Sequence, residues 1–452
     1  MTASQPEIRH AKDHAGPHGQ SGRAGQRVLA WSSVALLTLG AVGFVFAHMT
    51  RNTETGTGSY ISGDALTQAD DPHPSLLDAK LDVATPEGQL IRAYQLLASG
   101  DEGAAFATVE TLVHERPDFS LAQLLYADLL QARAGTPAPM MAASDANLSA
   151  DEARSVAQLR AEARLRLAAL VERPPLNALP REFASLSPTI KHAIAVDTSR
   201  ARLYVFENTS TGPRLLRDIY VSIGKQGTGK QVEGDLRTPL GIYHVGLRRD
   251  DAVDRYGAAA LPLNYPNEYD RQVGRSGSNI WIHGNNDGRF SRGPLASDGC
   301  VVLANEDMKS LAKLVEARET PVLIQEHLHW VKQGTPNVAA LDSGFEHAYQ
   351  RWERARLEQD ARTVGAFYEP GLERGSDSEA ERLAQNLARM SRHQWPVRSL
   401  QRISALPWTE KQKVVIVTYL EADENEGRAR LKRQYWREHD GHWTIMFDGL
   451  VG

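Results

Sequence analysis

Cysteine is almost missing from this chain, which has a single one, Cys300, among its 452 residues. A lone thiol cannot form an internal disulfide, so the sequence excludes a disulfide-stabilised scaffold. No spacing of histidine and cysteine resembles a metal-binding motif, and we expect no metal ion. Cys300 is therefore either a small buried apolar residue or a residue with a chemical role.

A basic tract is missing as well. The chain has 51 Lys and Arg against 56 Asp and Glu, a formal charge of −5, and the two signs are interspersed. Nucleic-acid binding relies on clustered cations, so we expect no nucleic-acid partner. The glycine-rich run 224–230 has the spacing of a phosphate-binding loop up to its lysine, but Gln231 replaces the hydroxyl residue that holds Mg²⁺. We therefore expect no nucleotide and no other cofactor.

What is present is a histidine placed to serve the thiol. His283 ends the strand-like run 278–282, and a loop rich in Gly, Asn, Asp, Ser and Arg joins it to Cys300. The thiolate is the nucleophile, and an imidazole lowers the pKa of a thiol or takes its proton. Gly299, directly before the cysteine, lets backbone amides approach a developing oxyanion. This pattern indicates an enzyme that forms a covalent intermediate.

Three blocks of residues resemble the YkuD-type catalytic domain of L,D-transpeptidases, the cysteine enzymes of bacterial peptidoglycan. The first block is 222–225 with 233–243, which contains Thr-Pro-Leu-Gly-Ile-Tyr. The second is 263–267 with Asp270, and the third is the His-Gly and Ser-x-Gly-Cys pair. The resemblance implies a mostly β catalytic domain over residues 188–327, and the strand-like runs from Ile190 onward favour the same fold class.

The resemblance also implies a role for each residue of the third block. Cys300 is the nucleophile, His283 is its base, the carbonyl of Gly284 or a nearby hydroxyl orients the imidazole, and Gly299 helps to form the oxyanion hole. Ser297 fills the Ser/Thr position of the family motif beside the substrate. We expect its hydroxyl to shape the turn by bonding to the backbone.

The substrate implied by the family is a peptidoglycan stem peptide, which is attacked at diaminopimelate to give an acyl-enzyme. Its carboxylates call for cationic and hydrogen-bonding groups, and arginine binds a carboxylate through two parallel bonds. The candidates lie in the His–Cys loop or in the second block: Asn285, Arg289, Arg292, Asn264 and Tyr265. We expect the last two to form a wall of the cleft, with a packed turn before Pro266 as the alternative.

Two positions differ from the commonest family pattern. The cross-linking enzymes read Ser/Thr-His-Gly-Cys, followed two places on by Arg or Asn; here Asp298 stands in place of the His, and Val302 in place of the Arg or Asn. The form with Val resembles the branch that contains L,D-carboxypeptidases and hydrolases. Transpeptidation, carboxypeptidation and cross-link hydrolysis therefore all stay open, and an inactive peptidoglycan-binding scaffold is the alternative outside the enzymes.

The first residues predict the location of the protein in the cell. Residues 28–47 are twenty positions without a charge, long enough to span a bilayer, and cations predominate before them while acids predominate after them. We expect a cytoplasmic segment 1–27, a single anchor 28–47 in the inner membrane, a flexible linker 48–84, and a catalytic domain in the periplasm. A cleaved signal peptide is the alternative.

Residues 85–175 show helical periodicity, with a proline between helices and small residues at packing positions. The pattern resembles a tetratricopeptide-type helical hairpin with one to one and a half repeats, too few to stand alone. The helices are either a surface for a protein partner or homodimer, or a helical cap on the enzyme domain.

The last segment, 338–452, begins with two helices, 343–357 and 378–390, and continues with strand-like runs. Helices followed by a curved antiparallel sheet predict a cone-shaped α+β domain. It resembles the NTF2-like domain that some L,D-carboxypeptidases of cell-shape pathways carry. It either binds a glycan, a peptide or a partner, or is structural and dimerising.

Overall fold

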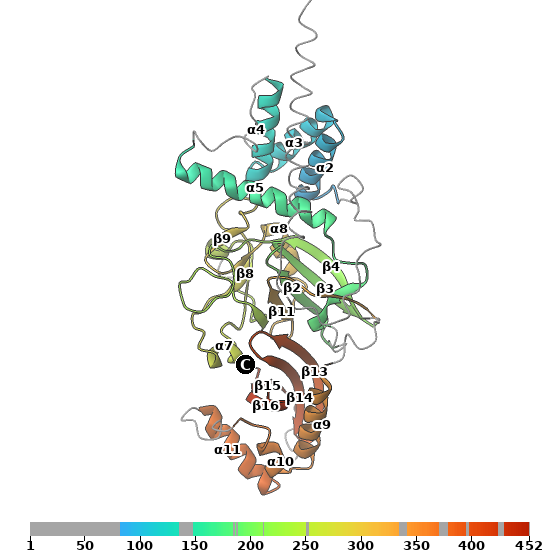
Figure 1. The fold of residues 1–452 in the computed structure, drawn as a ribbon, viewed down its shortest axis with the longest axis vertical. Helices are drawn as coiled ribbons and strands as arrows, with labels where there is room; N and C mark the ends of the chain where they lie inside the picture. The colour runs from blue at the N-terminus through green and yellow to red at the C-terminus, as the bar shows by residue number, and fades with distance from the viewer. Residues whose placement is uncertain are drawn as a thin grey trace, which may run out of the picture.

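The computed structural model describes residues 82–134, 148–183, 186, 189–210, 212–249, 253–333, 341–369, 378–394, 397–423 and 429–451. A helical region, a central β domain and a C-terminal β domain with its own helices follow one another along the long axis of the molecule (Figure 1). This order confirms the expected fold class at that level. The expected membrane span, 28–47, lies outside the described residues, and within them no helix is long and apolar enough to cross a membrane.

Among its described residues, the N-terminal region has the helices α2 Pro86–Ala98, α3 Glu102–Glu115, α4 Ser120–Arg133 and α5 Ala150–Val171. Three of them start at a residue whose side chain accepts from the first turn, namely Thr85, Asp101 and Ser149. Their apolar faces form one core that also takes in Phe290 and Ala304 of the central domain. Helix α5 lies across the top of the central domain (Figure 1). The helices therefore share a core with the β domain.

The central domain is built on a five-stranded sheet with the order β4-β3-β2-β11-β6. Its strands are β2 His192–Asp197, β3 Arg202–Thr209, β4 Gly212–Tyr220, β6 Gly241–His244 and β11 Pro321–Gln325. Strand β11 is parallel to β2 and antiparallel to β6. Both faces are apolar because alternate residues enter different cores: Ile194 and Val205 enter one, and Ala195 and Phe206 enter the other.

Shorter elements complete this domain and position the site. A three-stranded sheet has the order β10-β8-β7, and a further pair joins β5 to β9. Their bounds are β5 Ile223–Gly224, β7 Ala260–Pro262, β8 Trp281–His283, β9 Leu295–Ser297 and β10 Val301–Val302. The remaining elements are β1 Ala178–Pro180, α6 Val253–Tyr256, α7 Glu268–Gln272, α8 Asn305–Leu311 and β12 Trp330–Lys332.

The C-terminal domain has helices α9 Ser343–Leu357, α10 Ala361–Gly365 and α11 Ser378–Ser391, followed by a four-stranded antiparallel meander. The strands are β13 Val397–Thr409, β14 Lys413–Asp423, β15 Ala429–His439 and β16 His442–Leu450. One face packs on the helices and the other on the central sheet. The expected order of helices and strands is confirmed, apart from the short α10, which was not predicted; the NTF2-like resemblance stays a prediction.

Candidate active site

Cys300 and His283 belong to neighbouring strand ends and face the same way. Strand β10 pairs in parallel with β8, and the register places Val302 beside His283. Side chains alternate along a strand, so Cys300 points to the same side as Val302 and His283. Val301 and its partner Ile282 point the other way, into the core. The Cα atoms of the two candidate residues are one strand and two residues apart, about 8 Å, which facing side chains can bridge.

The thiol of Cys300 is half-buried and is held by backbone groups. Its Sγ donates to the carbonyl oxygen of Asn279 at 3.4 Å, and Asn279 has a left-handed φ of 57°. Burial raises the pKa of the thiol, while the backbone N–H of Trp281 and the charges of Arg292 and Lys230 act to lower it. The thiol is therefore protonated at rest, and groups that favour the thiolate already surround it.

The imidazole of His283 is held in one tautomer. Its Nδ1 lies 2.6 Å from the carbonyl oxygen of Gly284, and because a carbonyl only accepts, Nδ1 carries the proton. Burial lowers the pKa of His283 to about 4, and the positive charge of Arg292 acts in the same direction. The ring is therefore neutral at physiological pH, with Nε2 as an acceptor. This is the state that a general base requires.

Aromatic rings stand beside the pair. The ring of Tyr256 lies 5.0 Å from that of His283 and 4.2 Å from that of Trp281, measured between centroids. Both aromatic residues are half-buried, so each has one part packed and one part open to solvent. They give the site an apolar side on the α6 edge.

A single carboxamide fixes the backbone that carries the imidazole. The Oδ1 of Asn305 accepts from the amides of Ala258 at 2.9 Å and Asn285 at 3.0 Å, and its Nδ2 donates to the carbonyl of Asn285 at 2.8 Å. A Cβ at Gly284 would lie 2.8 Å from the nitrogen of Ala258, which leaves no room for a side chain. Asn305 is the first residue of α8, so the helix and the histidine loop are locked together.

The turn before the cysteine requires glycine. Gly299 has a φ of 124°, and a Cβ there would lie 2.7 Å from the carbonyl oxygen of Arg237. The buried hydroxyl of Thr238 donates to the Gly299 carbonyl at 2.9 Å and accepts from the amide of Gly224 at 2.9 Å. In a trans peptide the N–H points opposite to the C=O. Thr238 therefore also sets the direction of the Cys300 amide, for which no acceptor is found among the described residues.

Ser297 has the turn-shaping role that was expected of its hydroxyl. Its Oγ donates to the carbonyl of Cys300 at 2.6 Å and accepts from the amide of Gly299 at 3.1 Å. Ser297 is buried, so its hydroxyl is used inside the turn and not toward a substrate. The Gly299 amide is engaged in the same turn, which leaves the Cys300 amide as the better-placed oxyanion donor.

The glycine-rich run 224–230 opens the loop between β5 and β6, which contacts the cysteine turn and contains no helix among its described residues. Lys230 is buried, and its Nζ bonds to Asp235 at 2.7 Å and to the carbonyl of Val232 at 3.1 Å. Lys225 bonds to Asp298 at 2.8 Å on the exposed side of the turn. Of these two cations, Lys230 acts to lower the pKa of the thiol.

The predicted loop residues differ in what they contact. Arg292 is largely covered, and its guanidinium donates to the side chains of Asn285 at 2.7 Å and Asn286 at 2.6 Å. Arg289 is 55% exposed and is paired with Asp287, away from the covered part of the loop. Asn285 is buried and organises the loop through the carbonyl of Arg289. Of these residues, Arg292 is the one whose charge reaches both Cys300 and His283.

The prediction that Asn264 and Tyr265 line the cleft does not fit their contacts. The side chain of Asn264 accepts from the amide of His244 at 2.7 Å. Tyr265 is 5% exposed, lies in the central core, and its hydroxyl donates to the carbonyl of Ser276 at 3.1 Å. The packed turn, which was the alternative, describes both residues, because their polar groups are already satisfied by the fold.

Sequence reasoning missed several residues that shape the site, including Asn279, Thr238 and Asn305. Asn279 carried a usable signal, because asparagine after Ser-Gly-Ser is a residue that tolerates the left-handed conformation. Thr238 was quoted within the family motif but without a role. The three hydrogen bonds of the Asn305 side chain to distant backbone groups could not be predicted from the local sequence.

Comparison with known proteins agrees with this geometry. Residues 191–324 match the family model of the YkuD L,D-transpeptidase catalytic domain. The YafK proteins of Escherichia coli K12 and O157:H7, named as L,D-transpeptidases, are each 29% identical over 113 residues. These matches cover 22% of this chain and 42% of those relatives, so the chain spans less than half of their length. The predicted resemblance is confirmed for the central domain.

Solved structures with a similar fold cover more of the chain. Bd1075 of Bdellovibrio bacteriovorus gives a TM-score of 0.48 at 23% identity and covers 60% of this chain and 98% of that one. The helical cell shape determining protein Pgp2 of Campylobacter jejuni gives a TM-score of 0.45 at 21% identity and covers 59% of this chain and 95% of that one.

Proposed function

We propose that the chain is a cysteine enzyme that forms an acyl-enzyme with peptidoglycan stem peptides and acts in cell-wall remodelling and cell shape. One observation carries the proposal: a half-buried thiol and a neutral imidazole, with its proton on Nδ1, share one face of the β8–β10 pair. The family match of residues 191–324 supports the substrate class.

The first half-reaction follows from the site. Nε2 of His283 takes the proton of Cys300 as Sγ attacks the carbonyl carbon between the diaminopimelate and the terminal D-amino acid. The carbonyl oxygen becomes an oxyanion that the Cys300 amide stabilises. Collapse of the tetrahedral intermediate breaks the C–N bond, and the leaving amine takes the proton back from His283. The products are a thioester and a free D-amino acid.

The electrostatics favour proton transfer during attack over a resting ion pair. Burial opposes both charged forms, since it raises the pKa of Cys300 and lowers that of His283. Asp298 also opposes the sulfur anion, while the N–H of Trp281 and the charges of Arg292 and Lys230 partly offset that cost once the anion forms.

Arg292 is the residue we assign to the terminal carboxylate of the substrate. Its charge acts on the pKa of both Cys300 and His283. Its Nε pairs with Asp287 at 3.4 Å, and its bonds to Asn285 and Asn286 hold the guanidinium in place before any ligand arrives. Arg289 pairs with the same carboxylate but is 55% exposed, so it is the weaker candidate.

The second half-reaction decides between the activities of the family. Water gives an L,D-carboxypeptidase or cross-link hydrolase, and the amine of a second stem peptide gives a transpeptidase. We test this by incubating the purified protein with tetrapeptide muropeptides and separating the products. Tripeptides alone identify the carboxypeptidase, dimers or exchange of D-amino acids identify the transpeptidase, and cleaved dimers identify the hydrolase. A Cys300→Ser variant is the matched control.

An inactive scaffold makes the opposite prediction. It would bind muropeptides without turnover, and Cys300 would not be acylated by a carbapenem-like donor. Mass spectrometry of the intact protein after exposure to such a donor separates the two. An adduct that disappears in Cys300→Ser supports the enzyme, and the absence of an adduct supports the scaffold.

We also propose the cellular address that residues 28–47 predict, a single-pass inner-membrane protein with its catalytic domain in the periplasm. The uncharged length of this segment and the charge asymmetry around it support the proposal. Reporter fusions after residue 84 test it: a reporter that is active only in the periplasm should be active, and fractionation should place the chain in the inner membrane. A soluble periplasmic product would support the cleaved signal peptide instead.

A further inference from the structure

The loop that carries Arg292 does not stand free, because the helical region holds it at several consecutive residues. Phe290, Ser291 and Arg292 each reach an N-terminal helix directly or through one other residue, and the amide of Leu295 lies 3.4 Å from Oε1 of Gln158 on α5. The loop contacts the helical region through apolar packing at Phe290 and through hydrogen bonds at the other residues.

Phe290 is the apolar anchor. It is 7% exposed and belongs to the core of the helical region. Its ring centroid lies 4.6 Å from that of Phe119, and the guanidinium of Arg116 lies 4.5 Å from the centroid of the Phe290 ring. Its amide donates to the carbonyl of Asp118 at 2.9 Å. The middle of the loop between His283 and Cys300 is therefore inserted into the core of the helical region.

Ser291 is the polar anchor. Its hydroxyl donates to Oε1 of Glu162 on α5 at 2.7 Å. The same carboxylate accepts from Arg166 at 2.9 Å, and both charged side chains are almost fully buried. Burial raises the pKa of Glu162, while Arg166 and Ser291 act to lower it. A buried carboxylate in this setting has strict bonding requirements, which fixes where its partners lie.

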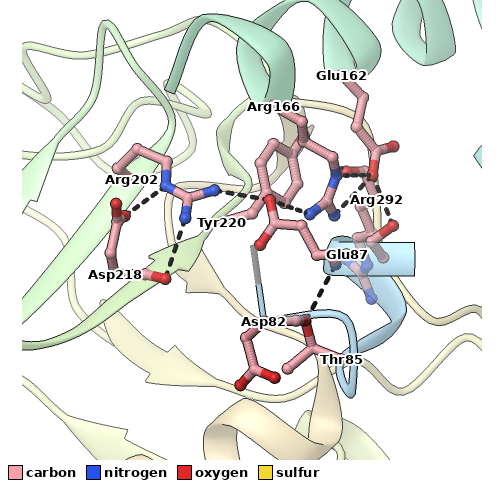
Figure 2. Close-up of polar contacts among 11 residues, drawn as sticks. Asp82, Thr85, Glu87, Glu162, Arg166, Arg202, Asp218, Tyr220 and Arg292 are labelled. Atoms are coloured by element: carbon pink, nitrogen blue, oxygen red, sulfur yellow. Dashed lines mark hydrogen bonds and ion pairs between the residues drawn. The ribbon is translucent and has the colours of Figure 1, made fainter. Parts of the chain in front are cut away.

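The anchor continues into the central sheet. Glu87 of α2 accepts from Arg166 at 2.8 Å and from Arg202 of β3 at 2.9 Å, and Arg202 bonds to Asp218 of β4 at 2.6 Å (Figure 2). Burial raises the pKa of Glu87, but Arg202 and Arg166 outweigh it and hold that pKa at about 2. Two helices and two strands are thus joined through five buried or half-buried charges.

Arg292 is fixed by the same group of residues. Its carbonyl accepts from the hydroxyl of Tyr220 at 3.0 Å, and the guanidinium of Arg166 lies 3.9 Å from the centre of the Tyr220 ring. Figure 2 shows Arg292, Tyr220 and Arg166 gathered at this point. The main chain of Arg292 is therefore set from the helical region, and its side chain is set from within the loop.

We propose that the helical region is part of the substrate-positioning apparatus. By holding residues 290–292 it fixes the Arg292 guanidinium within the loop that joins His283 to Cys300, and Glu162 and Phe290 are positioning residues that act through the loop. The assignment of Arg292 to the substrate carboxylate rests on the proposed function; its fixed place in the loop does not. A loop released from the helices would have to be ordered again at each binding event, which weakens binding.

The test measures the charge at the thiol without any peptidoglycan substrate. Cys300 of the whole protein is alkylated with iodoacetate, which is anionic, and with iodoacetamide, which is neutral, and the ratio of the two rates reports a nearby cation. Arg292→Ala sets the value without that cation. We expect Ser291→Ala to lower the ratio about threefold or more, toward that value.

Two controls and one double variant make the result specific. Ser291→Thr keeps the hydroxyl and should keep the ratio. Ser155→Ala removes an exposed hydroxyl that bonds within α5 and should change nothing. The double variant Ser291→Ala with Arg292→Ala should match Arg292→Ala alone, because Ser291 acts through Arg292. An unchanged ratio in Ser291→Ala, or additive effects in the double variant, would overturn the proposal.

Turnover separates this inference from the proposed function. With a tetrapeptide, Ser291→Ala should raise KM more than it lowers kcat, and the effect should vanish when the terminal carboxylate of the substrate is amidated. A protein without turnover whose alkylation ratio still responds to Ser291 refutes the function and keeps the positioning role. A protein with normal turnover and an unresponsive ratio keeps the function and refutes the positioning role.

Discussion

The central domain joins its two neighbours by interfaces with a different balance of polar and apolar contacts. The helical region meets it through buried ion pairs around Arg166 and Arg202 and through an apolar contact at Phe290, next to the loop between His283 and Cys300. The C-terminal domain meets it mainly through an apolar sheet-on-sheet contact on the other side of the five-stranded sheet, with an ion pair of Arg275 and Glu410 beside it. Leu406, Trp408 and Ile416 pack there against Tyr204 and other residues of that sheet face.

The two interfaces differ in whether they mainly stabilise the molecule or fix the positions of polar groups in the site. Apolar burial is favourable but non-directional, so the apolar part of the C-terminal contact holds two sheets together without specifying where any polar group of the site lies. Buried ion pairs gain little net free energy, since desolvation offsets their attraction, but they function only in one geometry. The polar interface is the one that touches the loop of Arg292. We infer that one interface stabilises the molecule and the other arranges the site.

The largest expected effect comes from replacing the proposed nucleophile, which lies at neither interface. The turnover of that variant is the reference value for both interface tests. Cys300→Ser should lower turnover of tetrapeptide by at least about 10⁴-fold, because the serine hydroxyl at this site lacks the acidity of a thiol. The melting temperature should stay within about 2 °C, since the residue is half-buried and nearly isosteric. Product analysis and calorimetry check the two parts. Substantial residual turnover would contradict the assigned nucleophile.

Arg166→Met tests the polar interface. Removing one partner leaves Glu162 buried without its cation and Glu87 with Arg202 alone, which we expect to lower the free energy of unfolding by about 3–5 kcal/mol. The kcat/KM of the molecules that remain folded should also fall, because Glu162 and Tyr220 lose the group that orders them. Arg154→Met on the same helix, where the side chain is 73% exposed, is the control and should change stability little. Denaturant melts with activity assays measure both.

Leu406→Ala tests the apolar interface. Truncation of this fully buried side chain should lower the free energy of unfolding by about 2–5 kcal/mol, through lost burial and a cavity. The kcat/KM per folded molecule should not change. Leu450→Ala, at a 56% exposed position, is the matched control. If Leu406→Ala changes kcat/KM as strongly as Arg166→Met, the division between the two interfaces is wrong.

The smallest expected effect is a shift in the pH dependence. The active form of His283 is neutral, and its pKa is lowered to about 4 by burial and by Arg292. Activity should therefore be lost only as the pH falls through about 4, and not near the ordinary value of about 6.5. Arg292→Ala should move this acid limb to higher pH, and Leu406→Ala should leave it in place. A wild-type limb near pH 6.5 would contradict the buried neutral imidazole.

The sequence alone was sufficient to predict those residues of the site that belong to one short motif. Cys300, His283 and Gly284 are close in sequence and their motif has one purpose, so the site centre was predictable. The ion pairs were not: Glu87 and Arg202 lie in separate domains, and charges on an amphipathic helix look solvated until its neighbours are known. Tyr265 was misjudged for a related reason, since a polar aromatic before proline suits a cleft and a packed turn equally well.

The side-chain amide of Asn305 has a consequence for how the site can move. It ties Ala258, Asn285 and the start of α8 together with three hydrogen bonds, so the imidazole and that helix move as one body. Displacing the histidine alone would break all three at once.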